Sequence, residues 1–185
     1  PTTSTEICPT PGTCGTMQSG WPMPHANTGL ASPNDFTNGA GVFDWTSGTV
    51  TTTLSGRYFR MVDSCGAISA AGTGDVAMGG SNGQHDCTTP GSGGAGNTPA
   101  SRSGFYELNR IAEQARGWLT SNSWLNAQVT SNMNLNQTCN AFWSGSVNFY
   151  RSGGGCRNTG EISGVFVHEW GHGMSQNDGA GFSNP

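Results

Sequence analysis

The segment of residues 164–178, GVFVHEWGHGMSQND, restricts the fold more than any other part of the chain. It holds His168 and His172 four residues apart, with Glu169 directly after the first histidine. On an α-helix, residues four apart project from one face, about one turn or 6 Å apart. A helical segment would therefore bring both imidazole rings and the neighbouring carboxylate together on one surface.

The residues before this segment predict where such a helix begins. Thr159 is a candidate N-cap residue, Glu161 falls in the first turn, and apolar residues follow at helical spacing. The Asn-Asp-Gly sequence at residues 177–179 is typical of a turn and predicts the end of the helix. We therefore expect a helix from about Thr159 to about residue 177.

The pair of histidines indicates a metal site. Zinc binds imidazole nitrogen at about 2.0–2.1 Å, and His168 and His172 on one helical face can both reach one ion. Glu169 is placed to hold and deprotonate a water, whose pKa zinc lowers towards about 7, as that water attacks a carbonyl. This is the HExxH arrangement of zinc metallopeptidases. The alternative interpretation is a pair of core histidines with buried hydrogen-bond partners.

A catalytic zinc site needs a third protein ligand, and the sequence leaves its identity open. Asp178 lies six residues after His172, the spacing at which metzincins place their third ligand. That family has a glycine three residues after the second histidine to turn the chain. Ser175 stands there instead, and a side chain is disfavoured in a left-handed turn. The alternative is that Asp178 belongs to an ordinary turn at the end of the helix.

The composition favours a small extracellular domain and argues against several classes of partner. Only 10% of the 185 residues are charged, 30 are glycine, and the net charge is −4. Such a chain is expected to form turns, short strands and long loops. Seven Lys and Arg residues provide no basic patch for nucleic acid or an anionic membrane. No apolar run approaches the roughly eighteen residues of a membrane-spanning helix.

Six cysteines lie along the chain without any CxxC pair, which argues against a zinc ribbon or a thioredoxin-like site. An even number in a chain of this composition indicates three disulfides formed in an oxidising compartment. We expect sequential pairing, Cys8–Cys14, Cys65–Cys87 and Cys139–Cys156; the alternative is that some are free buried thiols. The N-terminal residues have no signal-peptide character, so we expect a secreted protein whose signal and any pro-segment have been removed.

The chain divides into four regions. Residues 1–34 predict an irregular arm, residues 35–87 a strand-rich region with an antiparallel sheet, and residues 88–101 a flexible loop. Residues 102–185 contain two expected helices and the strands between them. We therefore predict an α+β fold in which an antiparallel strand-rich sheet is combined with two main helices and stapled by disulfides.

Within the last region, residues 101–121 form the clearest helical pattern, with apolar side chains at three- and four-residue spacing that predict core packing. Two strands are expected next, at about residues 127–135 and at residues 146–150. The NAFWSG segment, residues 140–145, is expected to be a loop or an edge strand before the second of them.

The segments CNAFWSGSVNFYRSGGG and GVFVHEWGHGM together resemble the thermolysin-like and fungalysin-like gluzincin zinc peptidases. The resemblance covers about residues 103–178 and implies the N-terminal lobe of that fold, with the HExxH helix under a cleft. It implies that His168 and His172 bind zinc and that Glu169 is the catalytic base. It also implies that the Asn140 side chain and the Ala141 carbonyl bind the backbone of an extended polypeptide substrate at the edge strand.

The sequence departs from the gluzincin pattern after the second histidine. Members of that family take their third zinc ligand from a downstream Glu, and a His or Tyr that stabilises the transition state from further along. Neither follows before Pro185, so we expect the catalytic lobe to be incomplete at its C-terminus. The missing part would come from the remainder of the catalytic domain or from another chain. The isolated 185 residues are expected to bind zinc weakly or to be inactive.

These patterns favour a secreted zinc metalloendopeptidase that cuts peptide bonds with Glu169 as general base. An alternative is an extracellular structural, filament or surface subunit that retains a degenerate peptidase fold. A third hypothesis is a peptidase complete within this chain, with Asp178 as the third ligand. Calcium sites at Asp63, Asp75 or Asp86 have no supporting loop pattern.

Overall fold

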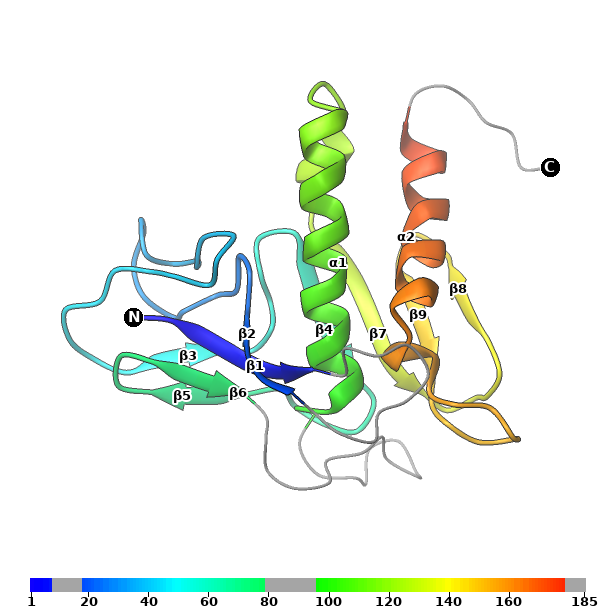
Figure 1. The fold of residues 1–185 in the computed structure, drawn as a ribbon, viewed down its shortest axis with the longest axis horizontal. Coiled ribbons are helices and arrows are strands. Elements are labelled where there is room, and N and C mark those ends of the chain that lie inside the picture. Colours follow the sequence, from blue (N-terminus) through cyan, green and yellow to red (C-terminus); the bar gives the residue numbers. More distant parts are fainter. Residues whose placement is uncertain (8–17, 79–95, 179–185) are drawn as a thin grey trace.

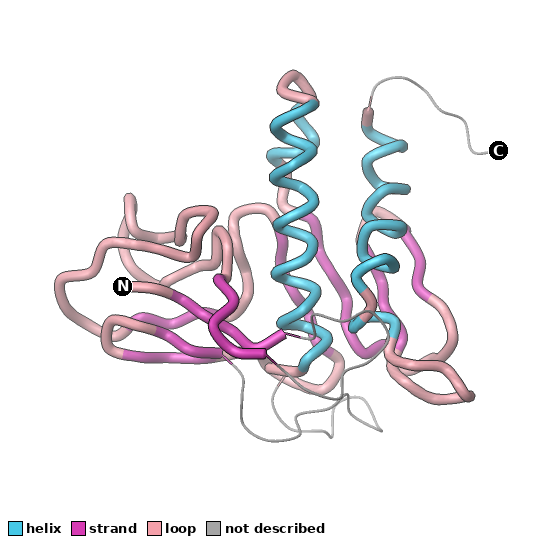
Figure 2. The backbone as a smooth tube through the Cα atoms, in the orientation of Figure 1, coloured by secondary structure: helices cyan, strands magenta, loops and turns pink. Residues whose placement is uncertain are grey.

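The computed structural model describes residues 1–7, 18–78 and 96–178, and it shows a mixed α+β fold (Figure 1). Two helices, α1 (Pro99–Trp118) and α2 (Ser163–Asn177), stand side by side against one face of a four-stranded sheet. The first part of the chain, with shorter strands and long loops, lies on the other side of α1 from α2 (Figure 2). The histidine pair is therefore on the helix farther from the N-terminal region.

The four-stranded sheet has the spatial order β4-β7-β9-β8. β4 and β7 pair in parallel, as do β7 and β9, whereas β8 runs antiparallel to β9. β8 therefore lies at an edge of the sheet, and α2 packs against β8 and β9. The strands are β4 (Phe59–Asp63), β7 (Val129–Leu135), β8 (Ala141–Trp143) and β9 (Val147–Tyr150).

The expected antiparallel pairing is wrong for two of these three pairings and confirmed for β8 with β9. Within residues 35–87 it is also confirmed, for the strands of residues 50–52 and 70–72. The connection from β4 to β7 is long and includes α1 and two short strands. A crossover of this length permits parallel pairing, whereas a short hairpin would impose antiparallel pairing. The positions of β7 and β9 confirm the strands predicted at residues 127–135 and 146–150. β8 shows that residues 141–143 form the edge strand that was one of the two expectations for this segment.

Two smaller sheets belong to the N-terminal region. One has the order β2-β1-β6, and the other pairs β3 with β5. Residues 1–34, for which the sequence indicates an irregular arm, contribute β1 and β2, because β1 pairs with the distant strand β6 and is ordered by it. The strands are β1 (Thr3–Ile7), β2 (Gln18–Pro22), β3 (Val50–Thr52), β5 (Ala70–Gly72) and β6 (Val76–Met78).

α1 confirms the helix predicted at residues 101–121, with its start at Pro99. The Thr98 hydroxyl accepts the amide N–H of Ser101, and proline in the first turn lacks only an N–H that has no helical partner. The loop expected over residues 88–101 therefore ends before Pro99, and its residues 88–95 lie outside the described part. Four of the six residues of the predicted apolar stripe are buried, namely Phe105, Leu108, Ala112 and Ala115. The other two are Ile111, which is half-buried, and Leu119, which is exposed at the C-cap.

The main core lies between the two helices and the sheet. Phe149 of β9 and Phe166 of α2 are fully buried and meet edge to face, with ring centroids 4.8 Å apart. Gly104 of α1 permits close approach, since a Cβ there would lie 3.0 Å from the ring of Phe166. Aromatic packing thus holds α2 along a face that does not carry the two histidines.

A buried polar network joins the sheet to the residues that lead into α2. The Asp63 carboxylate at the end of β4 accepts hydrogen bonds from the Thr98 hydroxyl and from Asn134 Nδ2, the latter at 3.1 Å. Asn158 donates from Nδ2 to Asn134 Oδ1 at 2.6 Å. All four side chains are buried, where an unpaired polar group is costly, so the network fixes where the chain enters α2.

Two of the three aspartates considered for calcium have protein partners. Asp63 belongs to the buried network, and Asp75 accepts hydrogen bonds from the amide and the hydroxyl of Thr2 at 2.7 and 3.1 Å. Asp86 lies outside the described residues.

The disulfide expected between Cys139 and Cys156 is confirmed, with Cα atoms 5.2 Å apart. Cys65 is also disulfide-bonded, whereas Cys8, Cys14 and Cys87 lie outside the described residues. The pairs Cys8–Cys14 and Cys65–Cys87 therefore stay predictions.

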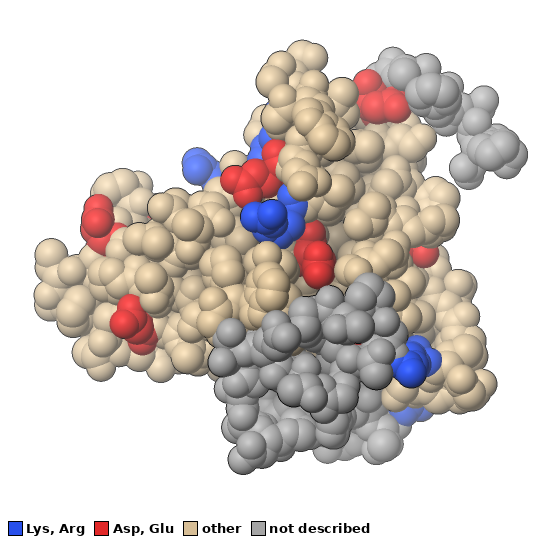
Figure 3. Space-filling view, in the orientation of Figure 1, with Lys and Arg blue, Asp and Glu red and all other residues tan. Residues whose placement is uncertain are grey.

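Charged side chains are sparse and mixed in sign over the face drawn in Figure 3. On α1, arginine and glutamate follow one another along the helix, so neither sign accumulates there. In the part of the chain that the structure describes, neither helix combines the length and the apolar character needed to span a membrane.

Candidate metal centre and cleft

α2 begins after a short 3-10 turn, η2 (Thr159–Glu161), rather than at Thr159. The N-cap of α2 is Ile162, which makes no side-chain capping bond, so the predicted capping role of Thr159 is wrong. Thr159 is used elsewhere: its Oγ1 accepts the amide N–H of Tyr150 at 2.9 Å and lies 3.0 Å from the carbonyl oxygen of Asn140. The predicted end of the helix at residue 177 is confirmed.

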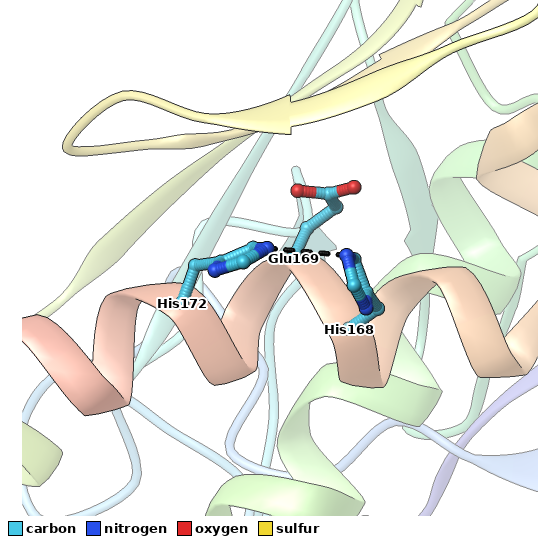
Figure 4. A group of neighbouring side chains, drawn as sticks. All are labelled: His168, Glu169 and His172. Carbon is cyan, nitrogen blue, oxygen red and sulfur yellow. Dashed lines mark hydrogen bonds between the residues drawn. The ribbon is translucent and has the colours of Figure 1, made fainter. Parts of the chain in front are cut away.

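The two histidines converge on one point in front of α2. Their Nε2 atoms lie 3.1 Å apart, and the ring planes are nearly perpendicular, at 88°. Both rings are exposed, which excludes the alternative of two buried core histidines. In Figure 4 the two rings approach each other along the dashed line, one helical turn apart on α2.

This spacing suits a shared metal ion. Two nitrogens bound to one zinc ion at about 2.0–2.1 Å, with a tetrahedral angle between them, lie about 3.3 Å apart. The observed 3.1 Å between the Nε2 atoms of His168 and His172 is close to that value. The spacing of the two imidazoles therefore allows one metal ion to be shared between them.

Glu169 completes the group from the next position of the helix. Its side chain is 6% exposed, and its carboxylate belongs with the two imidazoles to a cluster whose ligand atoms all lie within 4.8 Å of one another. Figure 4 shows the carboxylate on the side of α2 that faces the yellow strands of the sheet. Within the described ranges, no other group of His, Cys, Asp and Glu side chains has this geometry.

Asp178 is not part of this cluster. The backbone stays helical at Ser175, where a metzincin-like site would need a turn, and Asp178 is the C-cap residue with φ −76° and ψ −9°. Six residues along a continuous helix correspond to about 9 Å of rise and 240° of rotation. Because the helix is continuous, Asp178 lies beyond His172 and on a different side of α2 from the two histidines.

A cleft of about 550 Å³ opens between α2 and the edge strand β8. The helix contributes the three residues of the cluster, and the strand side contributes Asn140 and Ala141, so all five residues that the resemblance implies line one space. Asn140 is exposed and directly precedes β8, whereas Ala141 is the first residue of the strand. The remaining lining residues are Phe142, Trp143, Ser175 and Gln176.

One side of β8 is open to this cleft. Within the described part of the chain, β8 pairs only with β9, through Ala141 opposite Phe149 and Trp143 opposite Val147. The other side of an edge strand presents unpaired backbone N–H and C=O groups, which can pair with another extended chain. The cluster and a free strand edge therefore face the same cleft.

Trp143 sets the distance between the strand and the helix. Its ring lies directly over Gly173 of α2, where a Cβ would be 2.7 to 2.9 Å from three ring atoms. The absence of a side chain at Gly173, directly after His172, thus permits the close approach of β8 to α2. At Gly171, the other glycine beside His172, a Cβ would meet nothing within 4 Å.

The sequence interpretation missed four residues that line the cleft, Phe142, Trp143, Ser175 and Gln176. Gln176 lies eight residues after His168 and four after His172, so helical spacing alone places it on the same face. Trp143 lies two residues after Ala141, and strand alternation puts both side chains on one face. Both signals were present in the sequence.

Comparison with known proteins does not identify the chain: no family model, no curated protein and no solved structure matches it.

Proposed function

We propose that this chain carries the metal-binding helix and the substrate-binding edge of a secreted zinc metalloendopeptidase of gluzincin type. The observation that supports this proposal most is that His168, Glu169 and His172 share a single cleft with the free edge of β8. Peptide hydrolysis needs both a metal centre and a means of holding an extended backbone beside it.

His168 and His172 hold the metal through Nε2. Zinc, when bound, supplies a Lewis acid that makes a water more acidic and polarises a carbonyl group. A third ligand comes, on the gluzincin pattern, from a Glu outside residues 1–185, in the remainder of the catalytic domain or in another chain. The two histidines keep one side of the centre open to the cleft, since both rings are exposed and line it.

Glu169 is the general base. Its carboxylate lies next to both imidazoles and faces the strand side of the cleft, where a peptide carbonyl would lie. From this position it accepts a proton from the attacking water and passes it to the leaving amine. General acid–base groups of this kind contribute about 10²–10⁴-fold to rate.

The edge strand binds the substrate. An extended peptide adds to β8 as a further strand, so that backbone hydrogen bonds supply affinity with little dependence on side chains. Asn140 contributes its side chain and Ala141 its carbonyl, the roles that the gluzincin resemblance assigns to these positions. Export to an oxidising compartment agrees with the disulfide-bonded state of Cys65, Cys139 and Cys156.

The substitution Glu169→Gln tests this function in the purified full-length protein. The rate of peptide hydrolysis should fall by about 10²–10⁴-fold. The zinc content, measured by inductively coupled plasma mass spectrometry, should stay stoichiometric. Glu113→Gln, an exposed acid on α1 outside the cleft, is the matched control and should change neither quantity. Absence of hydrolysis by the wild-type protein, with no effect of Glu169→Gln, would instead favour the extracellular structural subunit.

A further inference from the structure

The disulfide between Cys139 and Cys156 lies directly beside the proposed peptide-binding edge. Cys139 immediately precedes Asn140, the first residue of the strand side of the cleft. Cys156 belongs to the loop that follows β9, the only strand with which β8 pairs in the described structure. The disulfide therefore links the residue just before Asn140 and β8 to the loop that follows β9.

Cys139 has an unusual backbone conformation. Its φ is +66°, in the left-handed region that residues with a side chain seldom adopt. This residue turns the chain from the end of β7 into the edge, so the direction of Asn140 and Ala141 depends on it. Something must hold a non-glycine residue in this conformation, and the disulfide acts on its side chain.

The partner of Cys139 sits on a closed turn. Gly153 and Cys156 exchange two backbone hydrogen bonds, of 3.0 and 2.9 Å, and the three glycines of residues 153–155 all have positive φ. Such a turn keeps its shape through its own hydrogen bonds, so it provides a fixed anchor for Cys139.

The other contacts at the start of the edge are few. The Asn140 carbonyl accepts the amide N–H of Tyr150 at 3.3 Å and lies 3.0 Å from the Thr159 hydroxyl. That hydroxyl has a second nearby acceptor, the carbonyl of Tyr150 at 3.1 Å, and it has only one proton to donate. In the described structure the disulfide is therefore the side-chain cross-link at the start of the edge, and it acts together with these shared hydrogen bonds and with the pairing of β8 and β9.

We propose that the Cys139–Cys156 disulfide is a positioning element for peptide binding, and that its reduction weakens peptide binding while leaving metal binding intact. The inference rests on the proposed function in one respect, the use of β8 as the substrate edge. Both cysteines are exposed, so a small thiol can reach the bond. Two equivalents of a small thiol reduce the bond. The S–S bond between Cys139 and Cys156 breaks, the two small thiols form a disulfide with each other, and both cysteines become thiols.

Metal binding should survive because α2 is held by other contacts. Phe166 and Trp170 are buried in the main core, and Asn158 anchors the entry to the helix through the buried polar network. None of these contacts involves the loop of residues 152–156. The histidines therefore keep their spacing when the disulfide is absent.

The test compares the full-length wild-type protein with its double variant Cys139→Ser/Cys156→Ser, both loaded with zinc. An extended, unlabelled peptide is used to separate KM from kcat, and zinc affinity is measured by competition with a chromophoric chelator. We expect kcat/KM to fall about 10- to 100-fold, chiefly through KM, because the edge is misplaced. Zinc affinity should change less than twofold, and amide hydrogen exchange should accelerate in β8 but not in α2.

A reductant provides the second arm. Tris(2-carboxyethyl)phosphine, which is oxidised to the phosphine oxide as water supplies oxygen and two protons, should raise KM of the wild type to that of the double variant. The same treatment of the double variant is the control for the disulfide of Cys65 and should have no further effect. An unchanged KM in the double variant, or equal losses of peptide and zinc binding, would overturn the inference. If the full-length wild-type protein hydrolyses no peptide, the proposed function is contradicted. In that case, unaltered amide hydrogen exchange in β8 of the double variant would separately contradict the positioning role.

Discussion

The indole Nε1 of Trp143 donates a hydrogen bond of 2.7 Å to Oε1 of Gln176 and thereby joins the edge strand to the metal-binding helix. The same indole ring packs against the backbone of Gly173. This contact and the hydrogen bond to Gln176 together set the separation between β8 and α2. Trp124 packs edge-on against this ring, with centroids 5.9 Å apart, and supports it from the side. A few residues therefore determine the width of the cleft, and replacing them tests its role.

Gly173→Ala should move the edge strand. The new methyl group would lie 2.7 to 2.9 Å from the Trp143 ring, and overpacking of this kind costs about 1–3 kcal/mol. We expect a lower melting temperature and a kcat/KM reduced by about tenfold or more. Gly171→Ala is the matched control: its Cβ has open space, so replacing a helical glycine there should stabilise the protein by about 0.5–1 kcal/mol. Equal behaviour of the two variants would show that the contact with Trp143 does not set the cleft.

Zinc should stabilise the folded protein through the two histidines. With free zinc a hundredfold above its Kd, the free energy of unfolding rises by about 2.7 kcal/mol, and this is measured as a shift of the thermal transition. His172→Ala should abolish most of the shift, because His168 is left as a single imidazole ligand beside Glu169. His25→Asn, which removes a histidine far from the cluster, should keep the full shift. A shift that persists without His172 would place the ion elsewhere.

Asn158→Ala should destabilise the fold without changing the metal centre directly. It removes the donor to Asn134 in the buried polar network and the acceptor of the Gly160 amide. Leaving buried polar groups unpaired costs about 1–3 kcal/mol each, so the denaturant midpoint should fall clearly. Asn126→Ala, at an exposed position of the short 3-10 helix after α1, should be nearly neutral. A neutral Asn158→Ala would mean that the network contributes little.

His25 should make stability depend on pH. Burial lowers the pKa of His25 from its ordinary 6.5, Arg116 and Arg57 lower it further, and Glu113 acts in the opposite direction. The ring meets Tyr58 edge-on, and Arg116 stacks over the same tyrosine at 3.7 Å. Since the folded state disfavours the charged ring, the stabilisation is complete above pH 6.5 and is lost as the pH falls through the lower folded pKa.

The control for this dependence is His25→Asn. The φ of His25 is +56°, and asparagine tolerates this left-handed conformation better than most residues but does not titrate near neutral pH. Urea denaturation from pH 7.5 to 4.5 should show a steeper loss of stability in the wild type than in the variant. Parallel curves would indicate that His25 titrates equally in both states.

Local patterns in the sequence were sufficient for both helices, for β7 and β9, and for the Cys139–Cys156 pair. Helical spacing depends on residues within a few positions of one another, and so does the placement of His168, Glu169 and His172 on one side of α2. The exception was the start of α2, where Thr159 bonds to Tyr150 rather than capping the helix. The Thr159 hydroxyl accepts the amide N–H of Tyr150, which comes close to it only in the folded chain.

The sequence by itself determined that two imidazoles and a carboxylate share one helical face, because a turn of helix has a fixed geometry. Only the tertiary structure decided that β8 lies at the sheet edge opposite them, and that β4, β7 and β9 run in parallel. Those relationships depend on pairing between distant segments and on the fit of Trp143 over Gly173, and no local preference encodes either of them.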